Sequence, residues 1–224
     1  LRSWMVGHLA DIQKRMIFLS SLYNWGVTNS YTSQILKKML NFAPQRSLPT
    51  LSKVTLKSWL RKNPDERPAT KGVIYLFADE FTNFMDVEVG ISFIKLLRHL
   101  GYKVIIPKHL ESGRTELSKG FLKKAKKLAE ENVLLLKDLV SEEKPLVGIE
   151  PSCILSFRDE YPDLVSKKLK EAAAKLAGCT MLYDEFFVRE IRRGNITADD
   201  FTDSRLRILL HGHCHQKSLA SIDP

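Results

Sequence analysis

A dense group of candidate metal ligands lies near the end of the sequence, in the stretch His211-Gly212-His213-Cys214-His215. Imidazole nitrogens and thiolate sulfurs are common ligands of zinc and of iron centres. On a strand, alternate side chains point to opposite faces, so we expect one or two of these residues, and not all four, to share an ion. Cys214, His213 and His215 are therefore candidate ligands of a metal or a cluster.

A second candidate is Cys153, in the stretch Glu150-Pro151-Ser152-Cys153. It follows a short apolar run and opens a predicted helix. The start of a helix favours an anion and lowers the pKa of a thiol, so Cys153 could be a thiolate and a metal ligand. The alternative interpretation is a small buried residue at a strand–helix junction.

Other residues that could react or bind a ligand give weaker signals. Cys179 follows a glycine between two predicted helices and is typical of a structural cysteine. The isolated histidines His8, His99 and His109 are expected at the surface or as satisfied core residues. The loop between His109 and Gly120 could hold an anion at a helix start, which is a weak signal. The sequence contains no GxGxxG or Walker motif.

Four short apolar runs can position these residues as strands buried on both faces. They alternate with helical patterns, which indicates an α/β fold with a largely parallel sheet and helices on both faces, preceded by a helical N-terminal extension. Ligands of such sheets lie at the carboxyl ends of the strands, so we expect function in the four loops that follow. The predicted strands are Val73–Ala78, Lys103–Pro107, Pro145–Glu150 and Arg207–Gly212.

The helices are predicted from apolar spacing, caps and breakers. The stretch 1–70 carries helices and prolines but no strand signal, and we expect it to form a separate extension. The predicted helices are Trp4–Leu22, Asn29–Leu40, Thr55–Leu60, Met85–Leu100, a long helix capped by Ser118 and reaching about Val140, Pro151–Asp159, Tyr161–Leu176 and Met181–Arg193.

Composition limits the classes of function. The 224 residues include 35 Lys and Arg against 26 Asp and Glu, a formal net charge of +9. The lysines are spread along helix faces without interleaved aromatic residues, which favours a solvated face or a docking surface for an acidic partner over nucleic-acid binding. No apolar run reaches about 18 residues, so we expect no membrane span. Three widely spaced cysteines suit a reducing cytoplasm. We also expect that both ends of the sequence are cut.

The loop motifs match a known family. The stretch from Val73 to Pro224, with Pro151-Ser152-Cys153 and the pair Cys214-His215, resembles the cysteine-rich CCG domain. That domain occurs in the anchor-type subunit of anaerobic glycerol-3-phosphate dehydrogenase, in one of the subunits of heterodisulfide reductase and in flavin-linked D-lactate, glycolate and D-2-hydroxyglutarate dehydrogenases. The resemblance implies a linker at 1–70, a first repeat at 71–206 and the start of a truncated second repeat at 207–224.

The first repeat departs from the family pattern. Where the resemblance implies a Gly-Cys, the chain has Phe77-Ala78-Asp79, and where it implies Cys-Cys-Gly, the chain has Glu111-Ser112-Gly113. Only Cys153 of this repeat remains, whereas an iron–sulfur cluster generally needs about four ligands. We therefore expect no cofactor in the chain by itself. The partners of Cys214 in a cluster would lie beyond Pro224.

The resemblance implies a region of a flavin- and iron–sulfur-dependent 2-hydroxy-acid dehydrogenase that serves electron transfer or acceptor docking. FAD and the iron–sulfur cluster would belong to the parent enzyme, and the chain alone would not turn over a substrate. Expected partners are flavin and ferredoxin-like domains of the parent and an electron acceptor, either a quinone or a carrier protein. The location would be cytoplasmic, or peripheral at the inner membrane through the parent. A zinc or other mononuclear-metal protein and a metal-free structural interaction module remain as alternatives.

Overall fold

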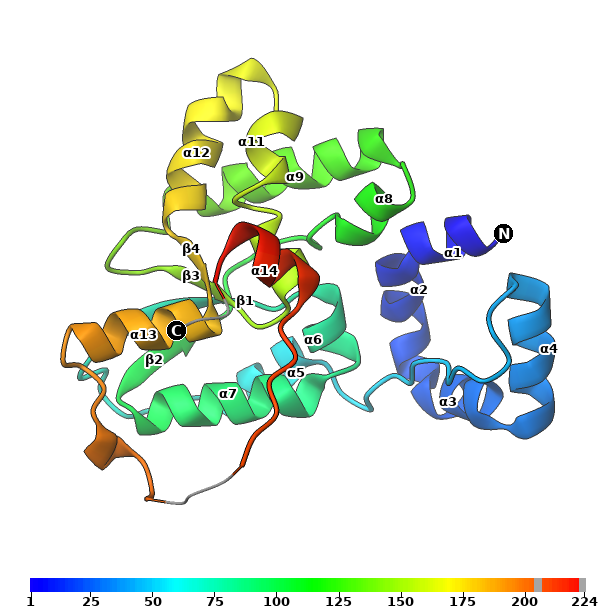
Figure 1. Cartoon of the computed structure of the whole chain (residues 1–224), viewed down its shortest axis with the longest axis horizontal. Coiled ribbons are helices and arrows are strands. Elements are labelled where there is room, and N and C mark those ends of the chain that lie inside the picture. The colour runs from blue at the N-terminus through cyan, green and yellow to red at the C-terminus, as the bar shows by residue number, and fades with distance from the viewer. Residues whose placement is uncertain (204–206, 222–224) are drawn as a thin grey trace.

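The computed structural model describes residues 1–203 and 207–221. Its centre is a four-stranded sheet in the order β2-β1-β3-β4, and every neighbouring pair is parallel. Figure 1 shows the sheet with helices on both sides, which confirms the expected α/β class. The strands are β1 (Gly72–Phe77), β2 (Tyr102–Ile105), β3 (Leu146–Gly148) and β4 (Thr180–Leu182).

Two apolar clusters, one on each face, hold the sheet in place. On one face, side chains of β1 and β2 pack with the helices α5 (Leu56–Lys62), α7 (Val87–His99) and α13 (Tyr183–Arg192). On the other face, β3 and β4 pack with α9 (Leu122–Leu136), α11 (Glu160–Leu164) and α12 (Lys170–Gly178). Burial on both faces explains why β1 and β3 are nearly continuous apolar runs.

The prediction of a fourth strand at Arg207–Gly212 is wrong. Residues 207–212 have no regular structure, and Ile208, Leu209 and Leu210 are exposed. The fourth strand is β4 instead, at a place where the sequence predicts the start of the helix Met181–Arg193. An apolar run predicts burial, but it does not show which segment it packs against. In the sheet, Val147 of β3 pairs with Met181 of β4. The preceding residues 204–206 lie outside the described part of the chain.

Several predicted helices are shorter than expected. The stretch Trp4–Leu22 is broken into separate pieces because His8 leaves the helical conformation, with φ −123°. The long helix expected from Ser118 forms as α9 but begins later, at Leu122, because Gly120, at φ 76°, separates it from the preceding helix. The expected Pro151–Asp159 helix ends early, as α10. The pieces are α1 (Arg2–Gly7), α2 (Leu9–Met16), a 3-10 turn (Ile17–Leu19), α3 (Ser20–Thr28), α8 (Arg114–Ser118) and α10 (Pro151–Leu155).

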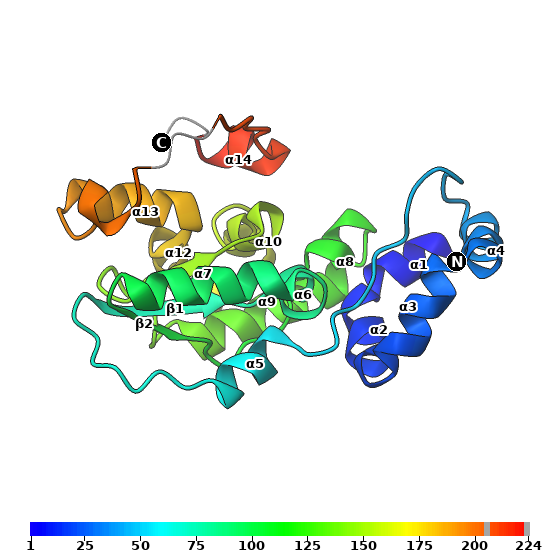
Figure 2. The same ribbon diagram turned by 90° about the horizontal axis from the view of Figure 1, so that it is seen from below.

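Other helices form where predicted. Asn29 caps α4 (Ser30–Leu40) by accepting hydrogen bonds from the N–H groups of Tyr31 and Thr32. Thr55 caps α5 in the same way, and Gly101 follows α7 at φ 92°. Figure 2 shows α1 to α4 together at one end of the molecule, beside the α/β body. Within the described residues, no helix has the length and apolar character of a membrane span.

Candidate functional site

The loops that follow β1, β2 and β3 meet at the carboxyl edge of the sheet. Asp79 follows β1 and caps α6 (Glu80–Phe84), accepting hydrogen bonds from the N–H groups of Phe81 and Thr82 at 2.8 and 2.9 Å. Its other carboxylate oxygen accepts the Thr82 hydroxyl at 2.6 Å. This cap fixes the start of α6 and turns Glu80 toward the loop that follows β2.

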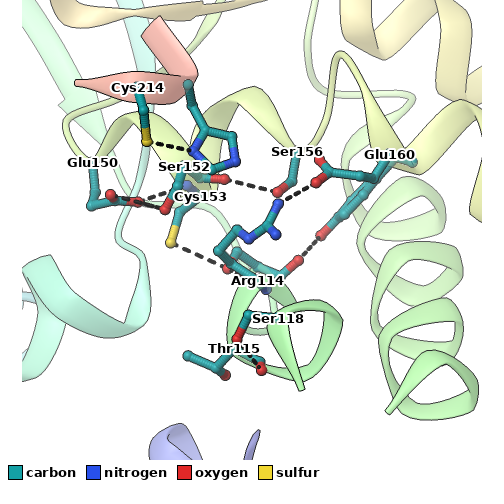
Figure 3. A network of polar contacts seen from close by, with 12 residues as sticks. Arg114, Thr115, Ser118, Glu150, Ser152, Cys153, Ser156, Glu160 and Cys214 are labelled. Carbon is teal, nitrogen blue, oxygen red and sulfur yellow. Dashed lines mark hydrogen bonds and ion pairs between the residues drawn. The ribbon is translucent and has the colours of Figure 1, made fainter. Parts of the chain in front are cut away.

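A buried chain of polar contacts joins three loops at this edge. Glu80 accepts the backbone N–H of Ser112 at 3.0 Å and its hydroxyl at 2.7 Å. The Ser112 oxygen lies 3.2 Å from the sulfur of Cys153 and accepts the N–H of Arg114 at 3.0 Å. Glu80, Ser112 and Cys153 are each at most 1% exposed. We call these three residues the buried triad (Figure 3 shows the Cys153 end).

The hydrogen bonds of the Ser112 hydroxyl can all be assigned within its surroundings. A serine hydroxyl has one hydrogen and two lone pairs. The oxygen accepts the Arg114 N–H, and its one hydrogen is donated to Glu80 when that acid is ionised or to the Cys153 sulfur when Glu80 is protonated. All polar contacts of Ser112 Oγ are then satisfied without a further ligand, and Cys153 is present as a thiol.

The loop that carries Ser112 is also held by side chains of α9 and α11. Asn132 of α9 accepts the Leu110 N–H at 2.7 Å and donates to the Glu111 carbonyl at 2.9 Å. The Tyr161 hydroxyl donates to the Ser112 carbonyl at 2.9 Å and accepts from Asn132 at 3.0 Å. The position of Ser112 is therefore set by packed helices rather than by the loop alone.

His109 has a structural role in the same loop. Its Nε2 accepts the Ala78 N–H at 3.3 Å, and its Nδ1 lies 2.7 Å from the Leu110 carbonyl. Burial, together with the nearby Lys57 charge, lowers the His109 pKa to about 3, so the ring is neutral. This agrees with the expectation that His109 is a satisfied core residue rather than a ligand.

Burial also raises the pKa values of two acids at this edge of the sheet. Desolvation, together with the charge of the neighbouring Asp79 carboxylate, raises the pKa of Glu80 to about 7. Desolvation is likewise the largest cause that raises the pKa of Asp79, to about 6. Removing a carboxylate from water penalises its charged form, and two such groups close together penalise it more.

Of the two interpretations of Cys153, the structure supports the small buried residue at a strand–helix junction, whose surroundings favour the thiol over the thiolate. Its pKa is raised well above the usual thiol value, first by desolvation and then by the negative charges of Glu80, Asp79 and Glu150. Cys153 does lie in the first turn of α10, but that helix has only five residues. A short helix dipole near three carboxylates does not compensate for complete burial.

The second group of candidate ligands lies at the start of α14 (Cys214–Leu219). One ligand atom each of His213, Cys214 and His215 lies within 4.8 Å of the others. His213 has extended backbone while Cys214 begins the helix, so the side-chain alternation of a strand does not apply here. The structure thus brings three expected ligands together and leaves Cys153 outside the group. Their roles as ligands stay predictions.

Glu150 lies beside this second group, because α14 packs against α10. The Nε2 atom of His213 is 3.9 Å from Oε1 of Glu150. The Oε2 atom of Glu150 accepts the Cys153 N–H at 2.6 Å and caps α10. Figure 3 shows Cys214 on the α14 side of α10 and the Cys153 sulfur directed the other way. The partner of this sulfur is the Ser112 hydroxyl.

The residues at the carboxyl edge do not fit an iron–sulfur cluster. Such a cluster needs about four ligands, mostly thiolates. The three loops supply one thiol, and the places implied for other cysteines are taken by Asp79, Glu111 and Ser112, which are engaged in hydrogen bonds or an ion pair. The sequence pointed to these loops, because each follows a buried strand. It gave no signal for Glu80 or for Glu150 as members of the two groups.

Comparisons with known proteins identify oxidoreductases as relatives. The chain is 28% identical to D-2-hydroxyglutarate dehydrogenase of Haemophilus influenzae over 175 residues, which cover 73% of this chain and 17% of that protein. It is 23% identical to the Escherichia coli K12 protein of the same name over 172 residues, which cover 72% of this chain and 17% of that protein.

A second kind of relative is a subunit of the anaerobic glycerol-3-phosphate dehydrogenase of Escherichia coli K12. It is 25% identical over 168 residues, which cover 74% of this chain and 42% of that protein. The matched part of the chain thus spans about a sixth of the first relatives and under half of the last. No family profile matches the chain, and no solved structure matches it. The relatives support an oxidoreductase region.

Proposed function

We propose that this chain is the first CCG-like repeat of a flavin- and iron–sulfur-dependent 2-hydroxy-acid dehydrogenase, with a helical extension before it. Within such an enzyme, the repeat serves as a scaffold for acceptor docking rather than as a carrier of electrons. The parent holds the FAD and the clusters, and the 224-residue chain alone does not turn over a substrate. The similarity to two D-2-hydroxyglutarate dehydrogenases and to a glycerol-3-phosphate dehydrogenase subunit supports the redox part of this proposal.

The observation that carries the choice of a scaffold is the buried triad. The loops after β1, β2 and β3 converge as the resemblance implies for a cluster site, but the place is filled by Glu80, Ser112 and Cys153. Their hydrogen bonds are mutually satisfied and sealed from solvent. A satisfied buried polar network holds the loops in one arrangement, which suits a rigid scaffold.

The N-terminal helices support a docking role. Two apolar stripes with helical spacing are exposed on neighbouring helices, one following the 3-10 turn into α3 and the other along α4. Apolar side chains that are exposed side by side on neighbouring helices are typical of an interaction site. We propose that it contacts the flavin and ferredoxin-like domains of the parent, in the cytoplasm. The stripes consist of Phe18, Leu22 and Trp25, and of Tyr31, Ile35 and Met39.

The test uses the longer protein that joins this chain to flavin and ferredoxin-like domains. Two rates are measured anaerobically: reduction of the flavin by a 2-hydroxy acid such as D-2-hydroxyglutarate, D-lactate or glycolate, and subsequent reduction of a quinone or carrier protein. We expect at least one of these acids to reduce the flavin. The Phe18→Ser/Trp25→Ser double variant should keep the first rate and slow the second by at least about tenfold.

Two variants make the test decisive. Leu134→Ser changes an exposed leucine on α9, away from the stripes, and should leave both rates unchanged. Cys153→Ser should also leave acceptor reduction unchanged, because a scaffold does not pass electrons through this residue. Loss of a cluster signal in Cys153→Ser would overturn the scaffold role. Failure of every 2-hydroxy acid to reduce a bound flavin would overturn the proposed reaction.

A further inference from the structure

The start of α14 has the chemistry of a mononuclear metal site. His213, Cys214 and His215 offer two imidazoles and one thiolate, with ligand atoms within 4.8 Å of one another. A tetrahedral zinc ion, with bonds of about 2.0–2.1 Å to nitrogen and about 2.3 Å to sulfur, needs ligand atoms about 3.3–3.6 Å apart. Cys214 Sγ and His215 Nδ1 are already 3.7 Å apart. A small closure of the remaining ligand would complete the spacing.

One ring nitrogen of His213, Nε2, lies near a carboxylate of another segment. Its Nδ1 accepts the His215 N–H at 3.2 Å, which fixes the ring at the helix start and leaves Nε2 for another partner. That partner is Glu150, whose Oε1 is 3.9 Å away. The histidine side chain is 38% exposed and the glutamate side chain 22% exposed, so an ion can reach both.

Glu150 can bind an ion without losing its structural role. Its Oε2 receives the N–H of Cys153 at 2.6 Å, so the cap of α10 uses one carboxylate oxygen. The Ser152 hydroxyl, 2.8–2.9 Å from both oxygens, can donate to Oε2 alone. Oε1 then remains as a monodentate ligand. Cys153 is not an alternative fourth ligand, because its sulfur is buried and bonded to Ser112.

We propose that Glu150, His213, Cys214 and His215 bind one divalent cation of the zinc type. Four protein ligands leave no open position, which is the arrangement of a structural rather than a catalytic zinc site. Binding requires the Cys214 thiolate, so one proton is released to solvent as the Cys214–metal bond forms. The site joins residues 150 and 213–215 and fastens α14 to the start of α10. This proposal is independent of the dehydrogenase role.

The other contacts of α14 show what a metal ion would add at this site. Within the described residues, Arg158 donates to the Leu219 carbonyl at 3.3 Å and the Gln216 amide contacts the Asp184 carboxylate. Leu219 is only partly buried against the neighbouring apolar cluster. Residues 207–211, before α14, are irregular and exposed, so an ion at residues 213–215 would add a fixed point at the start of the helix.

The test titrates the metal-free, reduced 224-residue chain with Zn²⁺ and with Co²⁺. We expect one equivalent of either metal and, for Co²⁺, the near-ultraviolet charge-transfer band of a thiolate ligand with the strong visible absorption of tetrahedral cobalt. Cys214→Ser should abolish the thiolate band. His213→Ala and Glu150→Gln should keep the band and weaken affinity at least about tenfold, since even outer-shell partners contribute about 10–100-fold. Zn²⁺ should also slow hydrogen exchange in α14.

Two matched controls separate this site from other modes of binding. His211→Ala removes an exposed histidine of the same segment that lies outside the set, and Cys153→Ser removes the buried thiol. Both variants should bind the metal as the original chain does. Loss of the band in Cys153→Ser, equal weakening by His211→Ala and His213→Ala, or the absence of one-equivalent binding would each overturn the proposal. If Glu150→Gln is unfolded by circular dichroism, the His213→Ala result decides.

Discussion

Replacing Glu80 with glutamine should change how the stability of the chain depends on pH. Glu80 is 1% exposed, and burial raises its pKa from 4.5 to about 7. Glutamine has nearly the same shape, and its carbonyl oxygen can still accept the Ser112 N–H now received at 3.0 Å. Glu80→Gln therefore removes the charge and keeps the packing of the buried triad.

The size and sign of the effect follow from the two pKa values. A raised carboxyl pKa means that the folded chain keeps a proton which the unfolded chain has lost. The resulting stability is present below pH 4.5 and is lost as the pH rises through about 7. The difference, 7 − 4.5 = 2.5 pKa units, corresponds to roughly 3–4 kcal/mol at about 1.4 kcal/mol per unit. The neighbouring Asp79, with a pKa of about 6, acts in the same direction.

The measurement is urea unfolding of both proteins at pH values from 4.5 to 8. The free energy of unfolding of Glu80→Gln, minus that of the original chain, should increase by up to about 3 kcal/mol across this range. Glu88→Gln changes an exposed acid of α7 and should follow the original chain within about 0.5 kcal/mol. A difference between Glu80→Gln and the original chain that does not vary with pH would refute the reasoning.

Three further predictions concern packing and reactivity. Gly148→Ala should lower the free energy of unfolding by about 1–3 kcal/mol, because a Cβ would lie 2.4 Å from Cβ of Ile154; unchanged urea unfolding would contradict this contact. Tyr102→Phe should cost about 1–3 kcal/mol in the same assay, since its hydroxyl donates to a buried carboxylate at 2.7 Å, and an unaltered midpoint would count against that bond. In the metal-free native chain, mass spectrometry should find alkylation at the exposed Cys214 long before the sealed Cys153, and equal rates would contradict the burial.

Much of the sheet could be predicted because burial leaves a direct pattern in the sequence. β1, β2 and β3 lie in apolar runs next to helical periodicity, and the helix caps at Asn29 and Thr55 have specific side-chain chemistry. β4 could not be separated from the helix that follows it, because a three-residue strand carries no period of its own. The prediction of a strand at Arg207–Gly212 failed because an exposed apolar run has the same composition as a buried strand.

The candidate site was only partly predictable for a different reason. Strand ends identified the loops of Ser112 and Cys153, since parallel strands bring their carboxyl ends to one edge. The ionisation of Cys153 depends on which acids surround it, and those acids come from two other loops. Glu150 was expected only as part of a strand, and its position beside His213 depends on how α14 packs on α10. Such pairings between distant segments leave no local pattern.

Reconstitution of the 224-residue chain with iron and sulfide tests the central claim most directly. The sample is prepared anaerobically, desalted, and analysed for iron, sulfide and visible absorption. Because the buried triad offers one protonated thiol where about four ligands are needed, we predict no sulfide-matched iron and no cluster band. Stoichiometric iron and sulfide, with a visible band that disappears in Cys153→Ser, would contradict the account of this repeat as a scaffold.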